Sequence, residues 1–160
     1  MNATPAAERS TEHATFEIER TFPHLPENVF AAFADLGVKS RWFGGPEYIS
    51  EDNQALDFRE GGTERLHGIH EGQHSTYDAR YIDIVRNERI IYTYEMTKDG
   101  RRISATVAAV ELTPVSGGTR LKLTEHGIYL DGQDQMAARE HGTNILIDRL
   151  AAVLDEGDPA

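Results

Sequence analysis

The feature that most constrains the fold is a strand followed directly by one long helix. Thr119–Leu130 reads TRLKLTEHGIYL, in which Leu121, Leu123 and Glu125 share one face of an extended strand. Asp131-Gly132 is a turn signal. The next 22 residues, QDQMAAREHGTNILIDRLAAVL, have the apolar spacing of an amphipathic helix. This order predicts a sheet that grips a helix around a cavity.

The side chains of this predicted C-terminal helix, the closing helix, can be assigned to its faces at about 100° per residue. The side chains expected to face the sheet are Met136, Thr143, Leu146, Ile147, Leu150, Val153 and Leu154. Gly142 lies at the edge of this stripe, where a missing side chain predicts close approach to a strand. Arg139 falls on the same stripe. Because an unpaired buried charge is very costly, we predict that Arg139 forms an internal ion pair with Glu125.

Length and composition restrict the class of protein. The 160 residues suit a single domain, and the absence of cysteine excludes disulfides, zinc–cysteine sites and thiol nucleophiles. A formal net charge of −11 argues against nucleic acid and against an anionic membrane surface. No stretch reaches the length of a membrane span, and no signal peptide stands at the start. These features favour a cytoplasmic protein.

The order of elements is read from periodicity and turn signals. Thr15–Phe22 alternates as a half-buried strand, Pro26 opens a helix that Gly37 ends, and Val38–Phe43 suggests a second short helix. Turn signals then recur at hairpin spacing, at Asp52-Asn53, Gly61-Gly62, Glu71-Gly72, Arg86-Asn87, Asp99-Gly100 and Gly117-Gly118. We therefore expect an α+β fold with a curved antiparallel sheet of about six or seven strands around the C-terminal helix.

The domain boundaries follow from the same pattern. Residues 1–14 are small and polar without periodicity, which predicts a disordered tail. Residues 15–154 then form one domain, and residues 155–160 are expected to fray.

Several motifs resemble the helix-grip fold of the SRPBCC (START-like) superfamily, in the branch named for the activator of heat-shock-protein-90 ATPase. They are PENVFAAFAD, RWFGGP, FREGGTERLHG, YIDIVRNERIIYTYEM, TRLKLTEHGIYLDG and REHGTNILIDRLAAVL, in family order between residues 15 and 154. The resemblance implies binding of an apolar or amphipathic small molecule between the sheet and the long helix. A minority of similar proteins are cyclases, dehydratases or hydrolases.

Candidate ligand-binding residues are those expected on the walls or at the mouth of such a cavity. Tyrosines on an inner wall supply apolar rings with polar tips, and small residues near the middle of 103–113 leave space under the helix. Arg65 and Arg80 would anchor an anionic head group or, alternatively, be solvated. The full set is Trp42, Phe43, Arg65, Tyr77, Arg80, Tyr92, Tyr94, Met96, Val107, Glu125, Tyr129, Arg139, Thr143 and Leu146.

Metal binding and catalysis have weaker signals. His67 and His70 point to opposite faces of a strand, and a turn separates them from His74, so we expect no metal site. Glu125 and His126 diverge on their strand for the same reason. Glu125, acting with a tyrosine, is the catalytic candidate. An enzyme requires Glu125 to be free of Arg139 and to lie within about 3 Å of another titratable group or an ordered water.

The sequence thus predicts a binder of a hydrophobic or amphipathic small molecule, without a cofactor. One alternative is a stress-related or chaperone-associated interaction module, as a homodimer or with another protein. A cyclase- or hydrolase-like enzyme that uses Glu125 is the third. A binder requires a pocket of roughly 300–1,000 Å³, whereas an interaction module requires a filled interior and an exposed apolar patch.

Overall fold

The computed structural model describes residues 9–44, 54–70 and 72–157. In chain order the elements are β1 (Thr11–Phe22), α1 (Pro26–Ala34), α2 (Leu36–Lys39), β2 (Gln54–Leu56), β3 (Thr63–His70), β4 (Gln73–Val85), β5 (Arg89–Lys98), β6 (Arg101–Val115), β7 (Gly118–Leu130) and α3 (Met136–Glu156). None of the helices in these ranges is long and apolar enough to cross a membrane.

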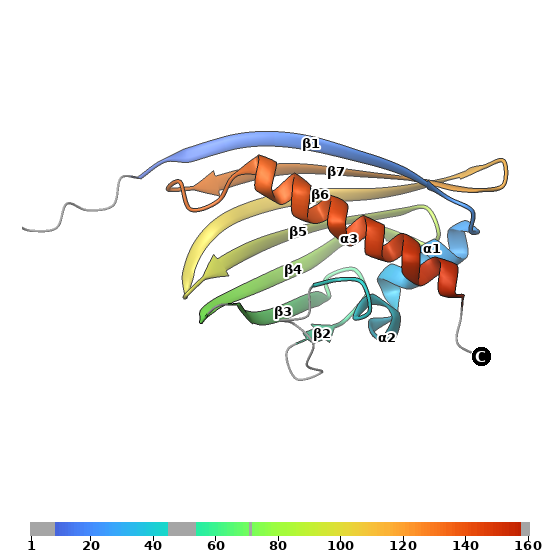
Figure 1. The fold of residues 1–160 in the computed structure, drawn as a ribbon, viewed down its shortest axis with the longest axis horizontal. Helices are drawn as coiled ribbons and strands as arrows, with labels where there is room; N and C mark the ends of the chain where they lie inside the picture. The colour runs from blue at the N-terminus through green and yellow to red at the C-terminus, as the bar shows by residue number, and fades with distance from the viewer. Residues whose placement is uncertain (1–8, 45–53, 71, 158–160) are drawn as a thin grey trace, which may run out of the picture.

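The strands form one antiparallel sheet in the order β1-β7-β6-β5-β4-β3-β2. Successive hairpins build it from β2 to β7, and β1 then pairs with β7 through a register from Thr11↔Leu130 to Phe22↔Thr119. The sheet is strongly curved, α3 lies across its concave face, and α1 and α2 stand near one end (Figure 1). The predicted α+β helix-grip architecture is therefore confirmed.

Within the described residues, the hairpin turns lie where the sequence signals them. Asn87 and Asp99 have φ angles of 65° and 50°, in the left-handed region that Asn and Asp tolerate better than most side chains. Gly117 has a φ of 80° in the β6–β7 turn, where glycine has no steric penalty. Because tight turns connect β4 to β7, each strand lies beside its sequence neighbour.

The hydrophobic core fills the end of the grip near α1. Phe16, Ile18 and Phe22 are buried on β1, as their alternation predicts. On α3 the buried residues are Thr143, Ile147, Leu150, Val153 and Leu154, while Met136 and Leu146 are partly buried against the core. The predicted stripe of the closing helix is thus confirmed.

The ends of some elements differ from the prediction. β1 begins at Thr11 rather than Thr15, because β7 extends to Leu130 and its backbone continues to pair with β1. The predicted disordered tail is therefore wrong for residues 11–14, and the predicted fraying is wrong for residues 155 and 156, which belong to α3. The first helix ends at Ala34 rather than at Gly37, and the second short helix, α2, covers Leu36–Lys39 rather than Val38–Phe43. The reason is Asp35, which caps α2 by accepting a hydrogen bond from the Gly37 N–H at 2.8 Å. Predictions for residues 1–8, 52–53, 71 and 158–160 lie outside the described residues.

Two glycines have opposite surroundings. Gly127 faces the concave side of β7, and a Cβ added there would lie 2.8–2.9 Å from the ring and hydroxyl of Tyr129. Gly142 on α3 has nothing within 4 Å of an added Cβ, so the predicted close approach to a strand is wrong. The phase at the edge of the stripe is correct, but Gly142 borders an open pocket rather than a strand.

Alanine substitutions at these two glycines should change stability in opposite directions. Gly127→Ala should destabilise the protein by about 1–3 kcal/mol, because Tyr129 must move. Gly142→Ala should stabilise it by about 0.5–1 kcal/mol, because alanine favours the helix and meets no obstacle. Urea denaturation of both variants measures the two effects, and equal free energies of unfolding would contradict the described packing.

Candidate functional site

A pocket of about 440 Å³ lies between α3 and the concave face of the sheet. Its walls come from the α1–α2 segment, from strands β3 to β7 and from the inner side of α3. The lining side chains include Phe33, Lys39, Trp42, Phe43, Phe58, Leu66, Tyr77, Tyr81, Ile90, Tyr92, Tyr94, Met96, Lys98, Leu123, Glu125, Asp134, Ala138, Arg139, Thr143, Ile145, Leu146, Ile147 and Arg149.

Aromatic rings dominate the sheet side of this pocket. Phe43 packs edge-on against Tyr77 at 5.0 Å between ring centroids, and Tyr77 lies 4.8 Å from Tyr94. Tyr92 stacks beside Tyr94 at 6.2 Å. Burial raises the pKa values of Tyr77 and Tyr92 well above the usual phenol value, so both hydroxyls stay protonated at neutral pH. The wall therefore presents apolar aromatic rings whose hydroxyl groups are uncharged.

Most residues predicted for the ligand site do line this pocket. They are Trp42, Phe43, Tyr77, Tyr92, Tyr94, Met96, Glu125, Arg139, Thr143 and Leu146. Trp42 also anchors the core, because its indole N–H donates to the Ala32 carbonyl at 3.0 Å. The predicted residue Tyr129 is buried on the concave face of β7 but is not among the lining residues, because its ring packs 5.5 Å from the Arg139 guanidinium instead.

Three predicted residues lie on the opposite face of the sheet. Val107 is 48% exposed, because the two-residue period of β6 turns Ala108 inward and Val107 outward. Arg65 donates from Nε to Asp78 Oδ1 at 2.8 Å on the exposed surface of β3 and β4. Arg80 is exposed on β4. The prediction that these residues reach the interior is wrong.

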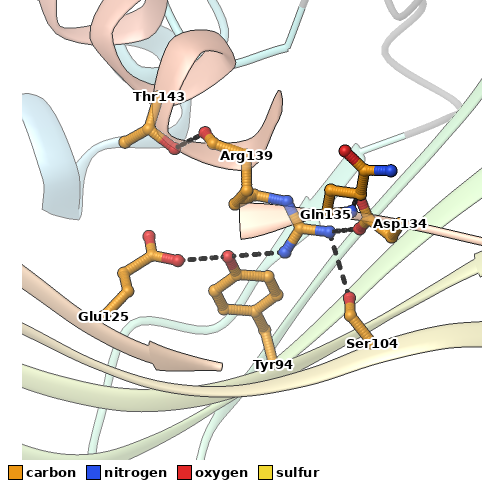
Figure 2. A network of polar contacts seen from close by, with 7 residues as sticks. All are labelled: Tyr94, Ser104, Glu125, Asp134, Gln135, Arg139 and Thr143. Carbon is orange, nitrogen blue, oxygen red and sulfur yellow. Dashed lines mark hydrogen bonds and ion pairs between the residues drawn. The ribbon is translucent and has the colours of Figure 1, made fainter. Parts of the chain in front are cut away.

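The predicted Glu125–Arg139 ion pair is replaced by a bridged arrangement (Figure 2). The Tyr94 hydroxyl donates to Glu125 Oε1 at 2.5 Å and accepts from Arg139 Nη1 at 3.0 Å. The prediction of a direct pair is therefore wrong, although the two side chains do meet inside. The physical reason is the length of Tyr94 on β5, whose hydroxyl occupies the space between the carboxylate and the guanidinium.

The direct ion-pair partner of Arg139 is Asp134, which lies just before the start of α3. Arg139 Nη2 contacts the Asp134 carboxylate and donates to Ser104 Oγ at 3.1 Å. Asp134 is held by its other oxygen, which accepts from the Gln135 N–H at 2.8 Å (Figure 2). The guanidinium thus has partners on three sides.

The carboxyl group of Glu125 is the least compensated charge of this cluster. Glu125 is 3% exposed, and desolvation raises its pKa above the usual 4.5, opposed by the Tyr94 hydrogen bond and the Arg139 charge. Desolvation and the neighbouring Glu125 also raise the pKa of Tyr94, which therefore acts as a neutral phenol.

A second buried polar cluster lies at the α2 end of the pocket. Lys39 Nζ donates to Glu64 Oε1 at 2.6 Å, and the Tyr81 hydroxyl donates to the same oxygen at 2.8 Å. Lys39 and Glu64 are 5% and 2% exposed. Glu64 Oε2 is buried and has no hydrogen-bond partner among the described residues.

Sequence reasoning missed this cluster. Glu64 shares the inward face of β3 with Leu66, so strand alternation could have placed it inside. Lys39 had no comparable signal, because the four residues of α2 are too few to show a periodicity.

The histidines form no metal site in the part of the chain described. His67 Nε2 lies 3.2 Å from His74 Nδ1 across the β3–β4 hairpin, a proximity that the predicted turn did not suggest. The side chain of His70 lies outside the described residues. No group of three or more His, Cys, Asp or Glu in the described ranges is placed to hold a metal ion. His126 points away from Glu125, as predicted, and contacts Thr15 Oγ1 at 2.9 Å.

The family described as "Activator of Hsp90 ATPase homolog 1-like protein" matches residues 23–155. No curated protein matches the chain. Among solved structures, an uncharacterised protein from Rhizobium leguminosarum is 41% identical with a TM-score of 0.89, over 93% of this chain and 99% of that one. The protein Mll3558 from Rhizobium loti is also 41% identical, with a TM-score of 0.82 over 90% and 99% of the two chains. CV1439 from Chromobacterium violaceum, at 24% identity and a TM-score of 0.73 over 87% and 95%, shares the fold.

Removing one member of the buried Lys39–Glu64 pair should be far more costly than removing both. Lys39→Met should destabilise the protein by about 3–5 kcal/mol, because it leaves the Glu64 carboxylate buried without its cation. The double change Lys39→Met with Glu64→Gln should recover much of this loss. Urea denaturation of the single and double variants measures the coupling.

The exposed pair Arg65–Asp78 on the opposite face of the sheet provides the matched control. The single variants Arg65→Met and Asp78→Asn, and the double variant that combines them, should each change the free energy of unfolding by less than about 1 kcal/mol. A loss in Lys39→Met no larger than in Arg65→Met would contradict the buried pair.

Proposed function

The chain belongs to the Activator of Hsp90 ATPase homolog 1-like family, and we propose that it binds a hydrophobic or amphipathic small molecule in the pocket between α3 and the sheet. Proteins of this fold family commonly bind ligands. The observation that carries the proposal for this chain is the pocket itself. Its volume of about 440 Å³ falls within the roughly 300–1,000 Å³ of small-molecule sites, and its walls combine aromatic rings with a few polar groups.

An interaction module is less well supported by this geometry. Such a module requires a filled interior, whereas the space beneath the α3 segment from Ala138 to Leu146 is hollow. Ile145, a candidate for an exposed apolar patch, is 39% exposed but also lines the pocket. Its exposure is therefore accounted for by a position at the pocket rim.

Acid–base catalysis is a second candidate because of one specific contact. Glu125 has no direct ion pair with Arg139 and lies 2.5 Å from the Tyr94 hydroxyl, which is the arrangement an enzyme requires. The Tyr94 hydroxyl donates a hydrogen bond to Glu125 and keeps its own proton because its pKa is raised, so Glu125 would be the base. Mass spectrometry that finds a bound molecule altered by the wild type and not by Glu125→Gln would favour catalysis over binding alone.

Blocking the pocket from the helix side tests the binding proposal. Ala138 and Ala137 are adjacent exposed residues of α3, but only Ala138 is among the pocket-lining residues. Ala138→Trp should weaken the binding of the neutral fluorescent probe N-phenyl-1-naphthylamine by about tenfold or more, since an indole ring occupies pocket volume. Ala137→Trp should leave this affinity within about twofold.

Fluorescence titration of the wild type and the two variants measures these affinities, and circular dichroism checks that each variant is folded. Equal loss in both variants, or saturable binding that Ala138→Trp does not weaken, would place the probe elsewhere and contradict the proposal.

A further inference from the structure

We propose that the pocket selects an organic ammonium ion, a molecule with an apolar or aromatic body and a protonated amine that donates to Glu125 Oε2. This inference rests on the proposed binding function and names the chemical class of the ligand. It follows from which polar atoms of the pocket already have partners.

Arg139, the buried cation of the cluster around Tyr94, already has hydrogen-bond and ion-pair partners within the protein. Arg139 donates to the Tyr94 hydroxyl and to Ser104 Oγ, and it forms an ion pair with Asp134. Its guanidinium also packs 5.6 Å from the ring centroid of Tyr94. An anionic ligand would have to displace the Asp134 carboxylate, whose position the helix start fixes. Arg139 is therefore a poor anchor for a carboxylate or phosphate head group.

Lys39, the buried cation of the cluster at the α2 end of the pocket, also has its partners within the protein. Lys39 donates to Glu64 Oε1 at 2.6 Å and lies 3.3 Å from the Tyr81 hydroxyl. Its ammonium also stands 4.6 Å from the centroid of the Phe43 ring. Because Glu64 carries a second oxygen without a partner, this end of the pocket lacks hydrogen-bond donors rather than acceptors.

Glu125 offers the accessible acceptor that a ligand can use. Its Oε1 receives the Tyr94 hydroxyl, while its Oε2 points away from Tyr94 and has no hydrogen bond within the described residues (Figure 2). The side chain lines the pocket although the residue is 3% exposed. The little surface that Glu125 keeps is at the pocket, where a ligand ammonium can donate a charge-assisted hydrogen bond to its carboxylate.

The charge and the walls around Glu125 favour a cation. The most deeply buried ionisable groups are Glu125, Asp134 and Arg139 at one end and Glu64 and Lys39 at the other, with a net charge of −1 when all are ionised. The more exposed Lys98 and Arg149 also line the pocket and bring the total to +1, so the preference for a cation is confined to the buried surroundings of Glu125. The rings of Tyr77, Tyr92 and Tyr94 add their negative faces, which attract ammonium groups.

Two further cations line the pocket outside these clusters. Lys98 and Arg149 are partly exposed, and Arg149 contacts the Gly44 carbonyl through Nη1. Solvent and salt screen such positions more than the interior. We therefore assign the selectivity to Glu125. If Lys98 and Arg149 determined the selectivity instead, an anionic probe would bind more tightly than an amine of the same shape.

The test compares probes that share a body and differ in charge. Tryptamine, 3-ethylindole and indole-3-propionate form one series, and octylamine, octanol and octanoate form another. Isothermal titration calorimetry at about pH 8 should give at least tenfold tighter binding for each amine than for its neutral and anionic counterparts. Glu125→Gln should remove this advantage, so that tryptamine and 3-ethylindole bind to the variant with affinities within about twofold of each other.

A measurement on the wild type alone keeps the test independent of whether Glu125→Gln folds. Affinity for tryptamine should fall as the pH is lowered through the raised pKa of Glu125, because protonation removes the acceptor charge, whereas affinity for 3-ethylindole should stay constant. Tighter binding of the neutral or anionic probes would overturn the ammonium inference and leave the proposed function intact. Failure of all six probes to bind would count against both.

Discussion

The Tyr94 hydroxyl, placed between Glu125 of β7 and Arg139 of α3, is the contact on which the arrangement of helix and sheet depends. It lets a buried carboxylate and a buried guanidinium lie on adjoining elements without touching, since the phenol donates to one and accepts from the other. A closer approach of α3 would bring Arg139 into the Tyr94 ring, and a more distant one would leave both charges without their hydrogen bonds. The spacing that results keeps the first half of α3 clear of the sheet and leaves room for a pocket.

The two buried clusters repeat one chemical pattern at opposite ends of that pocket. In each, a tyrosine of the sheet donates to Oε1 of a glutamate, and a cation from a helix approaches the same tyrosine hydroxyl. They differ in one respect that matters for function. Lys39 also bonds Glu64 directly, whereas Arg139 gives its direct ion pair to Asp134. Of the two glutamates, Glu125 is consequently the one without a direct ion pair, and it is the one that lines the pocket.

Much of the fold could be predicted from the sequence because its signals are local. Turn residues such as Asn87 and Asp99 mark the hairpins, and the spacing of Ile147, Leu150 and Leu154 gives the buried face of α3. Strand alternation also placed Glu125 inside. The site was predicted less well, because its chemistry depends on side-chain reach across strands. Alternation, applied to β6, would have turned Val107 outward. No local pattern could show that Tyr94 intervenes between Glu125 and Arg139, or that Lys39 of a four-residue helix meets Glu64.

The most direct test of this account is a carbon-13 NMR titration of the Glu125 side-chain carboxyl in the wild type and in Tyr94→Phe. Desolvation predicts that Glu125 titrates above 4.5 in the wild type. In Tyr94→Phe its pKa should rise further, because the hydrogen bond that stabilises the ionised form is lost. A wild-type pKa at or below 4.5 that does not move on removal of the Tyr94 hydroxyl would show that Glu125 is solvated or paired elsewhere, and would contradict the account.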